Sequence, residues 1–90
     1  MKTLQMRTKI MAPRKRVEVS TATYTGRFAV RLRELREKAG LSVEELGEKS
    51  GIPFKTIYGW ESASRSPSIE HLPALAQGLG VKIGKLLPEN

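Results

Sequence analysis

The side chains of this chain that could do chemistry are mostly cationic. Its 90 residues include 16 lysines and arginines against 9 acidic residues, and the net charge at pH 7 is +7. Six of the basic residues lie within residues 1–26, where Glu18 is the only acid, so this stretch alone carries +5. Such an excess of cations favours a polyanionic partner, and its uneven distribution predicts that the N-terminal end makes much of the attraction.

Catalysis and metal binding have few candidate residues. The chain has no cysteine and no aspartate, and His71 is its only histidine. Disulfide scaffolds, cysteine-ligated zinc modules and thiol enzymes are therefore excluded. No nucleophile can be paired with a base, so we expect no enzymatic activity, no metal and no cofactor. We interpret His71 as a surface or helix-start residue.

The distribution of apolar residues bears on where the protein acts. No stretch approaches the roughly 20 apolar residues that a membrane-spanning helix needs. The N-terminus also lacks the unbroken apolar core and the small-residue cleavage site of a signal peptide. We therefore expect a cytoplasmic protein without a membrane partner.

Residues 1–26 are predicted to form a basic arm, because their apolar residues follow no helical period and Pro13 interrupts them. The β-branched residues within 17–25 favour extended chain or an edge strand. Two roles remain open for the arm. Its cations Arg14, Lys15 and Arg16 could contact phosphates or enter a minor groove. Alternatively, residues 17–25 could pair with their copy in a second subunit.

Residues 27–88 change to helical periodicity and are predicted to form an all-α domain. The first helix follows Gly26 and ends at Gly40, and its apolar stripe comprises Phe28, Leu32, Leu35 and Ala39. The second helix lies between Ser42 and Ser50. It opens with a capping box, Ser42 followed three residues later by Glu45, and stops before Gly51, which suits a turn with positive φ.

Three further helices complete the predicted domain. The third begins near Pro53 and places Ile57 and Trp60 on one side. Pro73 would remove a hydrogen bond from a regular helix, so we expect a loose turn over residues 69–71 before a helix over 72–79. A last short helix spans residues 83–87.

The spacing of the second and third helices is that of a helix-turn-helix. Two helices that cross steeply through a short turn need a small residue where they touch, a glycine in the turn and apolar residues beside it. Residues 43–61 meet these needs with Leu46, Gly47, Gly51, Ile52, Ile57 and Trp60. With the helices on either side, residues 27–88 resemble the lambda and Cro repressor-like family of bacterial and phage DNA-binding domains, also called XRE-type regulators.

The resemblance implies a five-helix domain that regulates transcription by placing its third helix in the major groove of double-stranded DNA. Members of this family usually bind a palindromic operator as two-fold dimers, so we expect a homodimer. In the family, an arginine near the end of the first helix forms an ion pair with a glutamate after the recognition helix. Here these residues are Arg36 and Glu61, and we expect their ion pair to be structural rather than a DNA contact.

The recognition helix departs from the family pattern. Pro53 replaces a capping Ser or Thr, and Val43 replaces a glutamine, so two common phosphate contacts are lost. At positions that usually read bases, Lys55 could donate to guanine and Phe54 could touch a thymine methyl, whereas Gly59 has no side chain. For Phe54, packing against the core or a dimer partner is an equal alternative. Further residues are expected to contact phosphates, namely Thr56, Tyr58 and Arg65.

A second function remains open for the same fold. The second helix carries three glutamates, Glu44, Glu45 and Glu48, and the set of base-reading residues is small. An antitoxin or co-regulator module, whose main work is contact with a protein such as a toxin, would fit both observations.

Overall fold

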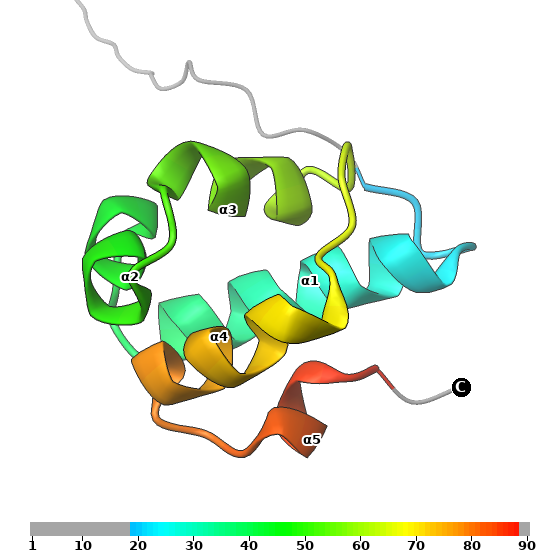
Figure 1. Cartoon of the computed structure of the whole chain (residues 1–90). Helices are drawn as coiled ribbons and strands as arrows, with labels where there is room; N and C mark the ends of the chain where they lie inside the picture. Colours follow the sequence, from blue (N-terminus) through cyan, green and yellow to red (C-terminus); the bar gives the residue numbers. More distant parts are fainter. Residues whose placement is uncertain (1–18, 89–90) are drawn as a thin grey trace, which may run out of the picture.

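Helices alone make up the regular secondary structure of residues 19–88, the range that the computed structural model describes (Figure 1). The five predicted helices are all present within that range. In chain order the elements are α1 (Tyr24–Lys38), α2 (Val43–Ser50), α3 (Phe54–Glu61), the 3₁₀ turn η2 (Ile69–His71), α4 (Leu72–Leu79) and α5 (Ile83–Leu86). The cations Arg14, Lys15 and Arg16 lie outside the described residues, so the role of the arm remains a prediction.

The start of α1 differs from the prediction. The helix begins at Tyr24, so the extended conformation expected for residues 17–25 is wrong at Tyr24 and Thr25. Thr23 is the reason: its Oγ1 accepts a hydrogen bond from the Gly26 N–H at 3.0 Å and caps the helix. Gly26 lies within the first turn, where a Cβ would collide with the Ser20 carbonyl oxygen. This local cap outweighs the β propensity of the preceding residues.

The core lies between the helices and draws on all five of them. Its fully buried large side chains are Leu32, Leu46, Ile57, Trp60, Leu75 and Leu86. Of the stripe predicted for α1, Phe28 and Leu32 are buried and Leu35 is half-buried. Ala39 is exposed, so that part of the prediction is wrong, because the helix ends at Lys38 and Ala39 follows its last packed turn.

Two glycines allow α2 to approach its neighbours closely. A Cβ on Gly47 would lie 2.8 Å from the Ile52 carbonyl oxygen, which confirms the need for a small residue at the helix crossing. Gly78 was predicted to end its helix, but it lies inside α4 and faces α2. A Cβ on Gly78 would lie 3.1 Å from Leu46 Cδ1. Gly80 alone ends that helix, with φ of +73°.

Proline has the predicted effect before α4. Residues 69–71 form a 3₁₀ turn, and the regular helix starts at Leu72 with Pro73 in its first turn. The capping box at Ser42 and Glu45 is also confirmed, with hydrogen bonds of 2.8 and 3.0 Å. Together these local features set where each helix begins.

Each of the helices α1 to α4 is followed by a residue in the left-handed region. These residues are Gly40, Gly51, Ala63 and Gly80. Three of the four are glycines, whereas Ala63 carries a side chain and still has a φ of +62°. It is held there because its N–H donates to the Trp60 carbonyl at 3.2 Å and the Ser64 N–H donates to the Gly59 carbonyl at 3.0 Å.

This strain at Ala63 predicts a stabilising substitution. The left-handed conformation costs an L-residue about 1–2 kcal/mol, and a glycine at this position would avoid that cost. Part of the stabilisation is offset, because glycine also raises the conformational entropy of the unfolded chain. Ala63→Gly should therefore raise the free energy of unfolding by roughly 1 kcal/mol, measured by urea denaturation. Ala39→Gly is the control, because Ala39 has φ of −79° and should gain nothing. Equal effects of the two substitutions would contradict the prediction.

Candidate nucleic-acid interface

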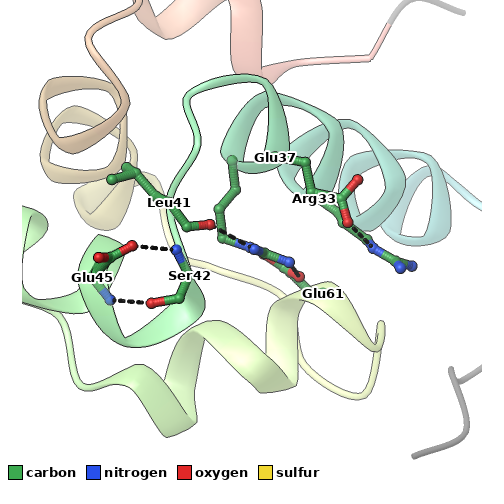
Figure 2. Close-up of polar contacts among 7 residues, drawn as sticks. Arg33, Glu37, Leu41, Ser42, Glu45 and Glu61 are labelled. Carbon is green, nitrogen blue, oxygen red and sulfur yellow. Dashed lines mark hydrogen bonds and ion pairs between the residues drawn. The ribbon is translucent and has the colours of Figure 1, made fainter. Parts of the chain in front are cut away.

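One partly buried ion pair holds α3 to α1. Arg36 Nε donates to Glu61 Oε2 at 2.6 Å, and Arg36 Nη2 donates to Oε1 at 3.0 Å. The two side chains are only 13% and 8% exposed. The third nitrogen, Nη1, donates to the Leu41 carbonyl at 2.8 Å in the turn before α2 (Figure 2). A single guanidinium therefore joins α1, the end of α3 and the start of the helix-turn-helix.

The surroundings keep Arg36 charged. Its hydrogen bonds to Glu61 raise the pKa of the guanidinium above its ordinary value, although burial acts in the opposite direction. Arginine is already protonated at every physiological pH. Arg36 therefore brings a permanent positive charge to the only acidic residue of α3.

The outer face of α3 is the candidate interface. Ile57 and Trp60 turn into the core, and α3 lies on the side of the bundle away from α5 (Figure 1). Lys55 is exposed on the opposite face. Because α3 is anchored by both the core and the ion pair, side chains on this face have a fixed backbone beneath them.

Two aromatic residues share this face, one helical turn apart. Phe54 is 38% exposed and Tyr58 is 47% exposed. Their ring centroids are 6.3 Å apart at an interplanar angle of 67°, an edge-to-face contact. Phe54 lies outside the buried core cluster, although its Cβ lies close to Gly47 of α2. Its two predicted roles, contact with DNA and packing against the core or a second subunit, both remain predictions.

The remaining predicted phosphate contacts lie in different places. Thr56 is half-buried, since it lies one step along the helix from Ile57 and on the flank of the exposed face. Arg65 is exposed and follows α3 in the turn toward η2. Its aliphatic carbons cover Gly59, a contact that sequence reasoning missed, because nothing in the local sequence links residues six apart across a helix end.

His71 has the structural role expected of it. The Ser68 N–H donates to His71 Nδ1 at 3.3 Å, and the imidazole lies against Trp60 with ring centroids 4.9 Å apart. Residues 19–88 hold no cluster of three His, Cys, Asp or Glu side chains able to bind a metal. In the same range, every helix is too short or too polar to span a membrane.

Comparison with known proteins places this architecture in a family. The helix-turn-helix family model HTH_3 matches residues 32–86, which include both residues of the ion pair and the whole of α3. The chain belongs to the helix-turn-helix family. This confirms the resemblance to the XRE-type regulators. The family and the relatives described below are transcription regulators, which are not enzymes.

Two curated relatives of this helix-turn-helix chain are named as regulators. It is 35% identical over 60 residues to the uncharacterized HTH-type transcriptional regulator YobD of Bacillus subtilis, covering 67% of this chain and 54% of that protein. It is 30% identical over 63 residues to the cryptic phage CTXphi transcriptional repressor RstR of Vibrio cholerae, covering 70% and 57%. The chain thus spans little more than half the length of these relatives.

Solved structures show the same fold. The restriction-modification controller protein C.AhdI from Aeromonas hydrophila is 36% identical, with a TM-score of 0.66, over 68% of this chain and 92% of that chain. The wild-type controller protein C.Esp1396I is 25% identical, with a TM-score of 0.67, over 72% and 84%. The all-helical architecture expected from the sequence is therefore that of known helix-turn-helix proteins.

The Arg36–Glu61 pair carries a stability prediction. Glu61→Ala would leave a partly buried, unpaired guanidinium, which costs at most about 3–5 kcal/mol, the value for a fully buried pair, and clearly more than an exposed pair. Chemical denaturation monitored by Trp60 fluorescence measures this loss. The double variant Arg36→Met with Glu61→Leu should be less destabilised than Glu61→Ala, because no charge is then left unpaired.

The matched control is a second Arg–Glu pair that also involves α1. Arg33 Nε lies 3.2 Å from Glu37 Oε2, with side chains 26% and 53% exposed (Figure 2). Glu37→Ala should change the free energy of unfolding by less than about 0.5 kcal/mol. A loss for Glu61→Ala no larger than that for Glu37→Ala would show that burial of the first pair is unimportant.

Proposed function

We propose that this protein is a sequence-specific DNA-binding transcriptional regulator that places α3 in the major groove. One observation carries the proposal: α3 presents an exposed face with Lys55 at its centre while its opposite face is held by Ile57, Trp60 and the Arg36–Glu61 pair. Because its backbone is already ordered, such a helix can present side chains to base edges without the entropy cost of ordering the backbone on binding.

Charge favours a DNA partner at this face. The only carboxylate of α3 belongs to Glu61 and is already paired with Arg36. The charged residues left to act outward are Lys55 on the helix and Arg65 in the turn that follows it. The net charge of +7, with +5 in residues 1–26, adds long-range attraction to the phosphate backbone.

The residues divide into two roles in this proposal. Lys55 donates to guanine O6 or N7, and Phe54 contacts a thymine methyl, supported edge-on by Tyr58. The phosphate contacts come from the flanks of the helix, through Thr56, Tyr58 and Arg65. The arm residues Arg14, Lys15 and Arg16 add contacts to the backbone or minor groove. The binding unit is a homodimer, whose two recognition helices read half-sites about one helical turn apart.

A second function is weaker on geometric grounds. An antitoxin or co-regulator module would use the acidic residues of α2 to contact a protein partner. Glu45, however, is engaged in the capping box, with its Oε1 accepting from the Ser42 N–H at 2.8 Å. That leaves Glu44 and Glu48 exposed one turn apart, a small charged surface for a partner.

Selection from a random duplex library tests the main proposal. Full-length protein at physiological salt should retain duplexes that share a two-fold symmetric motif, read out by sequencing. Retention of duplexes that share no motif would show that the protein binds DNA without sequence specificity. No retention, even at low salt, would reject DNA binding and leave protein contact as the leading function.

Lys55 is then tested on the selected duplex. Lys55→Gln should weaken binding by about 1–3 kcal/mol and relax the preference at one base position in each half-site. Lys82→Gln is the matched control, since Lys82 is the N-cap residue of α5, and α5 lies on the far side of the bundle from α3 (Figure 1). If both variants bind with the same affinity and the same base preferences, Lys55 does not read the sequence.

A further inference from the structure

The side chain of Arg65 lies against Gly59 on the surface of α3. A Cβ built on Gly59 would lie 3.0 Å from Arg65 Cδ, 3.3 Å from Cγ and 3.6 Å from Cβ. The aliphatic part of Arg65 therefore lies across the helix where a side chain of residue 59 would begin. Gly59 is one turn after Lys55, so Arg65 crosses the helix beside the candidate base-reading face.

The turn after α3 ties Arg65 to the residue that it covers. The carbonyl oxygen of Gly59 accepts from the N–H groups of Ser64 and Arg65 at 3.0 and 3.1 Å. The hydroxyl groups of Ser62 and Ser64 also lie 3.2 Å from this oxygen. The backbone at Arg65 is thus fixed relative to Gly59, and the position of its side chain follows from the fold of the turn.

The charged end of Arg65 is left for an external partner. Within residues 19–88 the two ion pairs are Arg33–Glu37 and Arg36–Glu61, and neither includes Arg65. A guanidinium offers a planar fork of donors that matches a phosphate. In helix-turn-helix proteins the N-terminal residues of the recognition helix contact base edges. Arg65 lies beyond the opposite end of α3, which places it toward the DNA backbone rather than the bases.

We propose that Gly59 is a positioning residue of the DNA interface. Because it lacks a side chain, Arg65 lies across α3 and supplies a phosphate contact from the place that a side chain at position 59 would otherwise take. This inference rests on the proposed function. It adds that residues 59 and 65 act as one unit, so a side chain at 59 competes with Arg65 instead of adding a contact.

Affinity for the selected duplex, measured across a salt series, tests the pair. Arg65→Ala should weaken binding about fivefold near physiological salt and flatten the dependence of log affinity on log salt by about 0.9, the value for one phosphate. Gly59→Ala should weaken binding in the same direction by a smaller factor, because its Cβ displaces Arg65 without removing the guanidinium. The loss should be the same for all sequences. The double variant should bind no more weakly than Arg65→Ala alone, because both changes act on the same contact.

Stability controls separate this effect from misfolding. Alanine forms helix better than glycine, and the clash is with a flexible side chain, so Gly59→Ala should keep the melting temperature. Gly84→Ala is the matched control, because a Cβ on Gly84 meets nothing within 4 Å, and it should bind like the wild type. Gly59→Lys combined with Arg65→Ala removes the clash altogether. It should restore both affinity and salt slope by carrying the cation on the helix itself.

The outcomes distinguish the two proposals. Wild-type affinity for Gly59→Ala, additive losses in the double variant, or no rescue by Gly59→Lys with Arg65→Ala would each overturn the coupling of Gly59 and Arg65, with the DNA-binding function intact. Failure of the wild type itself to bind any duplex would overturn the proposed function and this inference together.

Discussion

The partly buried pair between Arg36 and Glu61 is the interaction on which the rest of this structure depends. Each charge is largely shielded from water by the fold, so each requires the other, and the bidentate geometry allows little rotation of α3 against α1. The same guanidinium also binds the Leu41 carbonyl, which places the start of α2. Three contacts of one side chain therefore add to core packing in fixing the orientation of the helix-turn-helix against α1.

The ion pair also decides the charge of the outer surface. An unpaired carboxylate at the end of α3 would repel a polyanion, and its pairing with Arg36 removes that repulsion without removing the residue. The exposed cations Lys55 and Arg65 are then not opposed from within the helix. The Arg36 guanidinium therefore does two things: it anchors α3 to α1, and it neutralises Glu61, the only acidic residue of α3.

The end of α3 combines local strain with a fixed side chain. Ala63 adopts a left-handed conformation that glycine would adopt at lower cost. The turn that imposes this conformation also brings the Ser64 and Arg65 N–H groups to the Gly59 carbonyl. Strained backbone is retained where the surrounding contacts determine it, and here those contacts position a cation beside the recognition helix.

Features that depend on neighbours within about four residues were predictable from the sequence. The capping box at Ser42, the turn at Gly51 and the loose turn before Pro73 all follow from local hydrogen bonding and are present in the structure. The start of α1 was missed because the cap at Thr23 competed with a β-branched stretch, and sequence patterns do not rank those two effects.

The sequence by itself determined the five helices and the helix-turn-helix, because periodicity, caps and spacing are read along the chain. The pairing of Arg36 with Glu61 was expected from the resemblance to the lambda and Cro repressor-like family. Only the tertiary structure decided that Gly78 faces α2, that Thr56 lies on the flank of α3 and that Arg65 covers Gly59. The physical reason is that these contacts depend on how helices cross and how turns fold back. Packing of the whole core sets those angles, and no local sequence rule contains them.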